Sequence, residues 1–579
     1  MARRVAAERG KRVGAEVGYC IRFEDRSNTE TRLRYMTDGC LLRECLGDPT
    51  LSAYDVVVLD EAHERSLHTD VLFALMKRAV ATRGGQLRVL VTSATLDTGA
   101  FSAYFNNCPV LTVPGRSFKV DMHYHPVSKQ SRVEASVNVA LNLHVREGAG
   151  HILVFLTGME ECEQAVRFAN EKLHHLVEAG KEVADCMIVP LYGMMQSDDQ
   201  RNVFDEVPED CRKLVFSTNI AETSLTVNGV GFVIDCGYCK QKLFNPKTGM
   251  ESLVVTEVSQ VQATQRAGRA GRTQDGKCFR LYSEESFKRG LPKVTVPEIL
   301  RSNLASVVLQ MKAMGIDNVV TFDFMEPPDQ VRLVKSLRVL FLVGALDADG
   351  HLTDLGKRMS EFPLEPQYAR VLVAAEELGC GSEALTLVSI LSSEGVWYRP
   401  SRQNADQMAD AEDAQRRFVH PLGDHLTLLE VYRAWEDNGC DPEWCKRNWL
   451  HHRALRQAKD IRSQLFEQMS SRSMDLRKGG GKKDKDEALL EALCQGFFMQ
   501  SARLCAAGGG WLIAYENILV KAEGGSAVDG TTAEWVLYTE LVGSTIAHCL
   551  MRNVSAVKEQ WLKPLLPKLY EVDLRRLVG

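Results

Sequence analysis

The sequence lacks long apolar runs, an excess of positive charge and a framework of paired cysteines. Its longest apolar stretches, such as residues 56–59 and 152–156, are far too short to span a bilayer, which excludes a membrane-spanning protein. Lys and Arg number 70 against 76 Asp and Glu, so the net charge of −6 argues against binding nucleic acid through overall charge but leaves room for a local basic groove. The 16 cysteines show no disulfide spacing and no leader precedes the first predicted strand, so we expect a reducing, intracellular compartment.

The first half of the chain repeats one pattern, a short apolar segment followed by a polar loop and a helical stretch. Alternation of strands and helices is typical of parallel sheets, and segments apolar on both faces are typical of strands covered by helical layers. Two such α/β sheets fit the pattern, with a break near Pro114 and Gly115. The predicted strands lie in the segments DVVVLDEAH, LRVLVTSAT, HILVFLTG, MIVPLYG, KLVFSTNIAETS and GVGFVIDCG.

The second half is predicted to be mostly helical. Residues 333–356 indicate a helix, a turn at Asp349-Gly350 and a small strand pair, which is typical of a winged-helix unit. Residues 361–470 continue as amphipathic helices, and the charged, Gly-rich residues 471–487 predict a flexible linker. Alternation in GFFMQSARL, GGWLIAYENILVKA and AEWVLYTELV predicts a small β-domain. Because the chain is too long for one core, we expect domains over residues 1–114, 115–290, 291–360, 361–478 and 479–579.

Polar side chains follow several predicted strands, at the edge where parallel sheets bind ligands. Asp60, Glu61 and His63 follow one strand, and the two carboxylates suit a hydrated Mg²⁺ and an attacking water. Arg269 and Arg272, one helical turn apart among small residues, could clamp a phosphate that gains charge. Taken alone, the carboxylates also fit a solvated strand end, and the arginines fit a solvated helix start. Further hydroxyl and amide groups at such edges are Ser93, Thr95, Ser217, Thr218 and Asn219.

In this order and spacing, the motifs resemble those of the DEAH-box RNA helicases of superfamily 2. The chain carries DEAH at 60–63, SAT at 93–95, STNIAETSLT at 217–226 and QRAGRAGR at 265–272. The likeness continues through RSNLASVVLQMKAMGIDN, FDFMEPP, GDHLTLLEVYRAW, WCKRNWLHHRAL and AEWVLYTELV, so it covers nearly the whole chain. The resemblance implies an α/β fold with two RecA-like parallel-sheet motor domains, the first incomplete, followed by winged-helix, ratchet-like helical-bundle and OB-fold-like domains.

The resemblance assigns these motifs to ATP hydrolysis. It implies that Asp60 holds Mg²⁺ through water, and that Glu61 orients and deprotonates the attacking water. It also implies that His63 links the nucleotide site to the second motor domain near Gln265, with ATP between the two sheets. The remaining implied roles are arginine fingers for Arg269 and Arg272, and coupling of hydrolysis to domain movement for Ser93 and Thr95.

The resemblance also assigns residues to the adenine ring and to RNA. It implies that Phe204 and Arg4 stack on opposite faces of adenine, and that a hairpin over residues 240–255, closed by Asn245-Pro246, lies beside the RNA. Other implied nucleotide-site residues are Ser224, Thr226 and Asn228, the last of which replaces the family's usual Asp and removes one charge. Backbone contacts to RNA, which give affinity without sequence choice, are implied for Arg22, Thr37, Thr218 and Asn219.

A phosphate loop ending in Gly-Lys-Ser/Thr, which would neutralise the β and γ phosphates, does not occur in the 579 residues. The nearest match, GGGKK at 479–483, lies in the predicted linker, follows no strand and has Lys483 in place of Ser or Thr. We therefore expect an N-terminally truncated chain, with Met1 inside the first motor domain. A further departure is VKAEGGSAVDG at 520–530, which replaces an HPSS-like strand of the family, so no RNA contact is assigned there.

These observations favour an ATP-dependent RNA helicase that uses ATP and Mg²⁺ to translocate on or remodel RNA and ribonucleoprotein. An alternative is a non-catalytic RNA-binding or scaffold protein that keeps the helicase fold, because the phosphate loop is missing. A DNA helicase is a third alternative, which the C-terminal likeness to the RNA group disfavours. We expect RNA as the main partner, an activating protein such as a G-patch partner, no membrane, and a nuclear or nucleolar location, with splicing and ribosome assembly both open.

Overall fold

The computed structural model forms two compact units, each made of separate stretches of sequence. Unit 1 comprises Met1–Thr92, Phe244–Ser252 and Glu298–Gly579, and unit 2 comprises Ser93–Leu243 and Leu253–Pro297. The ranges of the five predicted domains stay predictions. The structure describes residues 1–579 except residues 23, 95–97, 116–117, 128–130, 181–182, 194, 196–202, 206, 209, 223–226, 246–249, 394, 399–404, 472–483, 506–508, 517, 543–548, 573–575 and 578–579.

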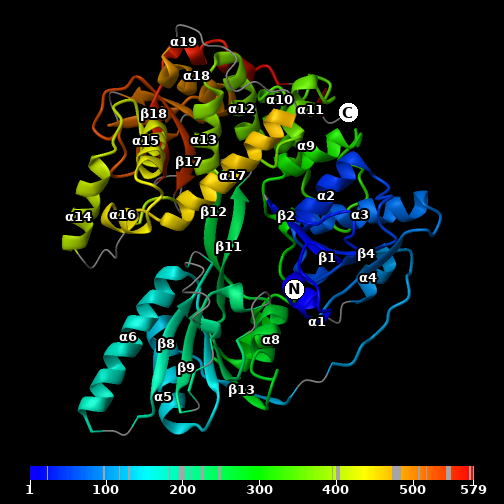
Figure 1. Ribbon diagram of the computed structural model, residues 1–579, viewed down its shortest axis with the longest axis vertical. Helices are drawn as coiled ribbons and strands as arrows, with labels where there is room; N and C mark the ends of the chain where they lie inside the picture. Colours follow the sequence, from blue (N-terminus) through cyan, green and yellow to red (C-terminus); the bar gives the residue numbers. More distant parts are fainter. Residues whose placement is uncertain are drawn as a thin grey trace. The chain divides into compact units, whose positions relative to one another are not determined.

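Unit 2 is built on a six-stranded sheet (Figure 1). Its strands are β6 (Val120–Tyr124), β7 (His151–Phe155), β8 (Cys186–Leu191), β9 (Arg212–Ser217), β10 (Val230–Asp235) and β13 (Gly276–Arg280), and its main helices are α5 (Arg132–Arg146), α6 (Met159–Glu178) and α8 (Gln260–Gly268). The order is β6-β13-β10-β7-β9-β8, and all neighbouring strands are parallel. This confirms the predicted parallel α/β arrangement.

The sheet of unit 2 is apolar on both faces because helical layers cover both. Ile152 and Val154 of β7 pack with residues of α5 and α6, whereas Leu153 and Phe155 pack with Ala267 of α8. All five are nearly inaccessible to solvent. The near-continuous run of apolar residues in β7 follows from this double coverage.

The predicted hairpin over residues 240–255 is present as strands β11 (Tyr238–Asn245) and β12 (Met250–Glu257). The predicted closure at Pro246 lies outside the described residues. The stretch Phe244–Ser252 belongs to unit 1. There the Phe244 N–H donates to the Arg301 carbonyl at 2.7 Å, and the Phe244 carbonyl accepts from Arg332 Nη1 at 2.8 Å.

The N-terminal part of unit 1 contains two small sheets and the helices beside them. Its elements are α1 (Ala2–Glu8), β1 (Val17–Ile21), β2 (Glu24–Arg26), β3 (Leu33–Met36), α2 (Asp38–Gly47), β4 (Val56–Leu59), α3 (Leu67–Thr82) and β5 (Arg88–Val91). Strand β1 lies between β2 and β3, and β4 pairs in parallel with β5. The expected burial of β4 on both faces is wrong, since Val56 and Val58 are 49% and 54% exposed. The described residues cover only one face of this strand pair.

A winged-helix unit follows, as predicted. Its helices are α9 (Ala305–Ala313), α10 (Gln330–Leu342) and α11 (Asp354–Ser360). Leu346 and Leu352 form the small antiparallel bridge between α10 and α11. The intervening turn needs glycine, because Gly350 has a φ of +78° and an added Cβ would lie 2.6 Å from the Leu577 carbonyl oxygen.

Helices then form the predicted bundle. They are α12 (Pro366–Leu378), α13 (Gly381–Leu391), α14 (Ala405–Arg416), α15 (Asp424–Asp437), α16 (Pro442–Arg447), α17 (His452–Ser471) and α18 (Lys485–Phe497). The predicted linker at 471–487 is too long, because Asp484 caps α18 by accepting from the Asp486 N–H, and α18 begins at Lys485. Most of the remainder of that linker lies outside the described residues.

The last part of unit 1 is a closed β-barrel of OB-fold type. Its strands are β14 (Ser501–Cys505), β15 (Gly510–Ile513), β16 (Leu519–Ala522), β17 (Trp535–Val542) and β18 (Leu550–Ala556), in the order β14-β15-β16-β18-β17. The strand predicted for GFFMQ is wrong, because these residues end α18 and form the 3₁₀ turn Phe498–Gln500. Helix α12 approaches so closely here that a Cβ on Gly496 would lie 2.4 Å from the Gln367 carbonyl oxygen.

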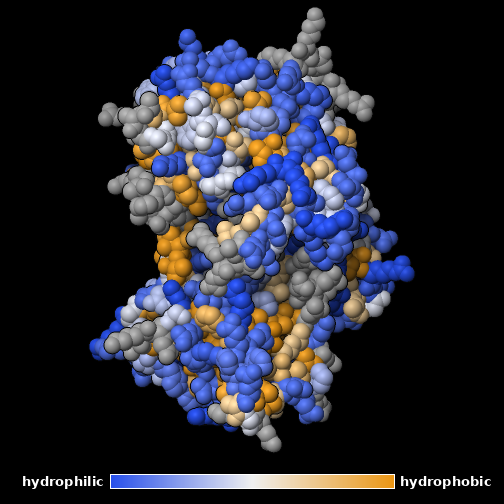
Figure 2. All heavy atoms as spheres, turned by 90° about the vertical axis from the view of Figure 1, so that its left-hand side faces the viewer, coloured by the Kyte–Doolittle hydropathy of each residue, from blue (hydrophilic) through white to orange (hydrophobic). Residues whose placement is uncertain are grey.

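A helix that crosses a bilayer needs a long and predominantly apolar stretch. Of the helices in the described parts of the chain, none combines the length and apolarity needed to cross a bilayer. On the face drawn in Figure 2, hydrophilic residues predominate and apolar residues form separate patches.

Candidate functional site

The acidic motif lies in the loop after β4, and backbone hydrogen bonds fix this loop to the end of β5. The Thr92 N–H donates to the Leu59 carbonyl and the Ala62 N–H donates to the Thr92 carbonyl, both at 2.9 Å. The Thr92 hydroxyl also donates to Asp60 Oδ1. Asp60 and Glu61 are exposed, so both carboxylates meet solvent at the carboxyl end of a parallel strand pair.

The backbone of this loop adopts a conformation that is uncommon for residues other than glycine. Glu61 and Arg65 have φ angles of 51° and 48°, and they flank a 3₁₀ turn over Ala62–Glu64. Such left-handed positions cost about 1–3 kcal/mol each and persist only where surrounding contacts hold them. The His63 side chain is only 5% exposed, and its Nδ1 lies 3.5 Å from Glu61 Oε2. The turn therefore presents Glu61 to solvent while it buries His63.

Arg65, a residue not predicted from the sequence, anchors the loop. Its guanidinium donates to the two oxygens of Asp70 at 2.5 and 3.1 Å and to Glu326 at 2.8 Å. Its carbonyl accepts from the Glu298 N–H at 3.0 Å, and Glu298 Oε2 accepts from the Leu67 N–H at 2.8 Å. Burial raises the pKa of Asp70, and the hydrogen bond from Arg65 opposes this shift. Because both glutamates lie far along the chain, no local sequence pattern could have revealed this anchor.

Asp38, also not predicted, connects the acidic loop with the turn that holds Thr37. Its Oδ2 accepts from Ser66 Oγ at 3.0 Å and from the Thr69 hydroxyl. Ser66 is the N-cap of α3, and Thr37 is the N-cap of α2. The starts of two helices therefore share one carboxylate.

Arg22 and Thr37, two predicted RNA contacts, line one groove of unit 1. The groove has a volume of about 1230 Å³. The Arg22 guanidinium donates to the Pro363 carbonyl, and burial lowers the pKa of Arg22 while the nearby Glu365 opposes this shift. Other polar residues that line the groove are Arg43, His68, Gln310, Arg456, Asp460 and Gln464.

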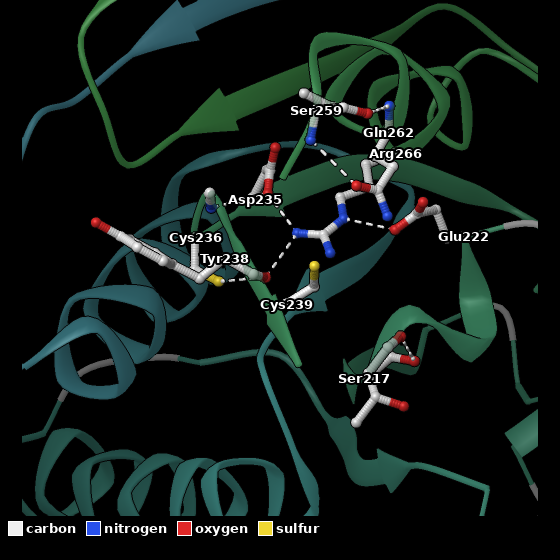
Figure 3. Close-up of polar contacts among 12 residues, drawn as sticks. Ser217, Glu222, Asp235, Cys236, Tyr238, Cys239, Ser259, Gln262 and Arg266 are labelled. Atoms are coloured by element: carbon white, nitrogen blue, oxygen red, sulfur yellow. Dashed lines mark hydrogen bonds and ion pairs between the residues drawn. The ribbon is translucent and has the colours of Figure 1, made fainter. Parts of the chain in front are cut away.

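In unit 2, the first arginine of QRAGRAGR is completely buried within an ion triad (Figure 3). Arg266 Nε donates to Glu222 Oε2 at 3.0 Å, and its Nη1 donates to Asp235 Oδ1 at 2.8 Å. Its guanidinium carbon lies 4.8 Å from the centre of the Phe155 ring. Burial lowers the pKa of Arg266, but attraction to Asp235 and Glu222 outweighs burial and leaves the pKa above its ordinary value. The triad was not predicted, although an acidic residue ending the apolar strand β10 was a visible indication.

The other two arginines of the motif follow α8 instead of sharing one of its turns, because the helix ends at Gly268. Arg269 is 8% exposed, and its Nη2 donates to the Glu222 carbonyl. Arg272 is exposed. The prediction that helical spacing makes these two side chains point the same way is therefore wrong. Gln265, on α8 itself, is half-buried.

The remaining predicted residues lie in several places. Ser93 is exposed two residues after the end of β5, and Asn228 is exposed in the turn before β10. Thr218 and Asn219 begin a 3₁₀ turn after β9. Phe204 is half-buried against the core of unit 2, and Arg4 is exposed on α1 in unit 1, so their adenine sandwich stays a prediction. The predicted residues Thr95, Ser224 and Thr226 lie outside the described residues.

Three family models match parts of the chain. Residues 135–274 match the helicase conserved C-terminal domain. Residues 336–364 match the winged-helix part of the helicase-associated domain HA2, and residues 365–428 match its ratchet-like part. These matches agree with the parallel sheet of unit 2, with the bridge between α10 and α11, and with the start of the helical bundle.

A curated relative resembles almost the whole chain. It is the pre-mRNA-splicing factor ATP-dependent RNA helicase prp22 from Schizosaccharomyces pombe, which is 43% identical over 571 residues. The match covers 99% of this chain and 48% of the relative, so the chain spans about half the length of that protein. With DEAH at 60–63, the helicase C-terminal domain, the two helicase-associated parts and this identity, the chain belongs to the DEAH-box RNA helicases of superfamily 2.

Proposed function

We propose that the chain supplies motor and C-terminal domains of an ATP-dependent RNA helicase that acts on pre-mRNA in the nucleus. Its family supports ATP use and RNA as a partner, and the name of the splicing relative supports the pathway and the location. An activating partner of G-patch type remains part of the proposal on family grounds alone.

The observation that carries this proposal is the pair of exposed carboxylates after β4. Asp60 and Glu61 project from a loop that is fixed to β5 on one side and to Arg65 on the other. One or two carboxylates together with substrate phosphates are the usual protein contribution to a Mg²⁺ site, because this ion keeps several of its waters. The donor set therefore fits Mg²⁺ with ATP.

The chain's own residues would act on water and on charge. When bound, ATP with Mg²⁺ would supply a γ-phosphate that is open to attack. Glu61 would orient the attacking water and accept its proton at a carboxylate oxygen, while Asp60 would hold the ion through water. His63 Nδ1, 3.5 Å from Glu61 Oε2, would restrict the rotation of that carboxylate. For Arg269 and Arg272 we propose the finger role that the family resemblance implies.

RNA would bind along the groove of unit 1. Arg22 brings a cation to the groove and Thr37 brings a hydroxyl at the N-terminus of α2, which are the groups that hold phosphates without reading bases. The shared carboxylate of Asp38 gives a physical link from this groove to the acidic loop.

The test of the proposal is RNA-stimulated ATP hydrolysis by a chain extended to include a phosphate loop. Glu61→Gln should leave ATP binding nearly intact and lower turnover by at least about 100-fold, because the water loses its base. Glu64→Gln is the matched control, since Glu64 is an exposed neighbour in the same turn. Equal turnover in the two variants would show that Glu61 is not the base.

A second candidate function is that of a non-catalytic RNA-binding protein. It is favoured because the 579 residues contain no phosphate loop. We expect the 579 residues assayed alone to bind RNA and to show little ATP turnover, because the triphosphate lacks a backbone cradle and its Lys. If the extended chain also binds RNA without hydrolysing ATP, the non-catalytic function holds.

A further inference from the structure

Two cysteines meet in the groove of unit 1 that also contains Arg22 and Thr37. Cys20 lies on β1, and Cys40 lies in the first turn of α2. The turn between β3 and α2 brings them together, because the Thr37 N–H donates to the Cys20 carbonyl at 3.1 Å and the Cys40 N–H donates to the Thr37 carbonyl at 2.9 Å. Both thiols are half-buried and line the groove, so both are open to small solutes.

The surroundings of Cys40 favour its thiolate. The Thr37 hydroxyl donates to Cys40 Sγ at 3.2 Å, and the sulfur lies at a helix N-terminus, where partial positive charge gathers. The pKa of Cys40 is lowered to about 6, first by the hydrogen bond from the Cys20 thiol, then against burial by Thr37 and by the charges of Arg43 and Arg34. The same hydrogen bond, followed by burial, raises the pKa of Cys20.

Other charged and titratable groups around the two thiols do not reverse this arrangement. Asp25 on β2 raises the pKa of Cys20, which keeps that thiol protonated. Arg22, which follows β1, interacts favourably with a Cys40 thiolate. His68 of α3 faces the α2 turn at Gly39, and burial lowers the pKa of His68, so its ring is neutral near pH 7. The pair thus combines one nucleophilic sulfur with one protonated sulfur.

The nearby thiol of Cys45 lacks this environment, so its pKa can be compared with that of Cys40. Cys45 lies on the same helix five residues after Cys40, but it is completely buried. Burial raises the pKa of Cys45 to about 12. A buried thiol of this kind is inert toward oxidants in water, since the thiolate is the reactive species.

We propose that Cys40 and Cys20 form a peroxide-sensitive dithiol in the RNA groove, with Cys40 as the nucleophile and Cys20 as the resolving thiol. The Cys40 thiolate attacks one oxygen of hydrogen peroxide, which breaks the O–O bond, gives a sulfenic acid at Cys40 and releases hydroxide. The Cys20 sulfur then attacks the Cys40 sulfur, so that an S–S bond forms and the S–O bond breaks. The Cys20 proton and the departing hydroxyl leave as water, and the two thiols have lost two electrons to the peroxide.

The disulfide would change the groove in three ways. It removes the negative charge of the Cys40 thiolate, and it replaces a strong acceptor for the Thr37 hydroxyl with a weak one. A link between β1 and α2 also restrains the turn that carries Thr37 and Asp38. This consequence for RNA rests on the proposed function, whereas the thiol chemistry does not.

The first experiment maps the oxidation products of the 579-residue chain after brief treatment with hydrogen peroxide. Trypsin places Cys20, Cys40 and Cys45 in the separate peptides 13–22, 35–43 and 44–65, each with a single cysteine. We expect a disulfide between the first two peptides and an unmodified Cys45. Before oxidation, iodoacetamide at pH 7 should alkylate Cys40 at least about tenfold faster than Cys45. Equal rates, or no cross-linked peptide, would overturn the proposal.

The second experiment assigns the two sulfurs. In Cys20→Ser, peroxide should leave a sulfenic acid on Cys40 that a 1,3-diketone such as dimedone traps. In Cys40→Ser, Cys20 should stay reduced and yield no adduct. Trapping at Cys20 in Cys40→Ser, to the extent seen at Cys40 in Cys20→Ser, would reverse the assigned roles and overturn the proposal.

The third experiment separates the thiol pair from the RNA groove. Saturating single-stranded RNA should slow the alkylation of Cys40 at least about fivefold, because phosphates held by Arg22 and Thr37 cover the sulfur. If the disulfide forms but RNA gives no protection, the dithiol stands and the proposed RNA groove fails. If RNA binding is intact and no disulfide forms, the dithiol fails and the proposed function stands.

Discussion

Arg266 places a permanent charge where no solvent reaches it, and its two carboxylate partners are almost as deeply buried. A buried ion triad of this kind stabilises weakly compared with apolar packing, but removal of one member leaves charges without compensation. Arg266 therefore serves to hold α8 against β10, whereas the exposed Arg272 of the same motif follows the end of α8.

We predict that Arg266→Leu destabilises unit 2 by about 3–5 kcal/mol, because Glu222 and Asp235 lose their shared cation. Amide hydrogen exchange of β10 measures this effect without assuming a single unfolding transition for a chain of two units. Arg272→Leu is the matched control and should change protection by less than about 0.5 kcal/mol, as exposed positions usually do. Similar loss of protection in both variants would contradict a structural role for the triad.

Residues whose role depends on partners far away in the sequence could not be predicted from the sequence. Asp60 and Glu61 could be predicted as site candidates because both follow a strand directly, and the structure places both at the exposed strand end. Arg65 could not, since its partner Glu326 is 261 positions away. Likewise, the burial of Arg266 depends on Glu222 and Asp235, which belong to other segments of unit 2.

At the scale of elements, helix α15 and strand β18 are joined by polar contacts that burial makes sensitive to acid. Asp424 accepts from the N–H groups of Ala527 and Val554 at 2.7 and 2.8 Å. His425 Nδ1 lies 2.8 Å from the Ser555 hydroxyl, and the ring is completely buried. Burial lowers the pKa of His425 to about 3. Burial of this neutral imidazole carries no penalty only at a pH where the same imidazole is also largely neutral in the unfolded chain.

We predict that this contact weakens as the pH falls. Because the folded pKa of His425 is depressed, its contribution is complete above the unfolded pKa of about 6.5 and is lost progressively as the pH falls toward 3. Between pH 7 and 5 the loss should reach about 2 kcal/mol in the hydrogen-exchange protection of β18.

Two variants separate this effect from other acid-sensitive groups. Burial raises the pKa of Asp424, so protonation of that carboxyl acts in the opposite direction and its share must be subtracted. The difference between the native chain and His425→Gln isolates the histidine, and His174→Gln, at a ring 73% exposed, controls for loss of any imidazole. A pH dependence that persists unchanged in His425→Gln would rule out this histidine.

Elements were predicted well where a local pattern and its tertiary surroundings agree. Strands β7, β8, β9 and β10 of unit 2 are short runs rich in apolar and β-branched residues, and two covered faces suit such runs. The segment GFFMQ alternates as a strand does, but Phe498 is completely buried at the end of α18, and the close approach of α12 at Gly496 fixes a helical end. The structure of this segment therefore follows from its burial and not from its alternating sequence pattern.

At the scale of the whole molecule, a net charge of −6 must still allow binding to a polyanion. We predict that Arg22→Ala weakens binding of single-stranded RNA equally for different sequences and reduces the slope of log K against log salt by about 0.7, the value for one lost phosphate contact. Fluorescence anisotropy over a range of salt concentrations measures both quantities.

Arg447→Ala is the control for this measurement, since Arg447 is exposed on α16 and is not among the residues that line the groove. It should leave the slope unchanged. A reduction that is the same for both arginines would mean that RNA responds to total charge and not to the groove.

The strand order of unit 2 has a consequence for the synthesis of the chain. Among the described strands, β6 pairs with β13 alone, and contacts between them, such as Arg280 with Tyr124, join residues 156 positions apart. A ribosome that has finished β6 must therefore add β7 to β10 and the whole hairpin before the partner of β6 exists. Until then the nascent sheet has an unpaired edge on β10 and β6 has no partner strand, and unpaired strand edges of this kind are prone to aggregation and are bound by chaperones when translation stalls.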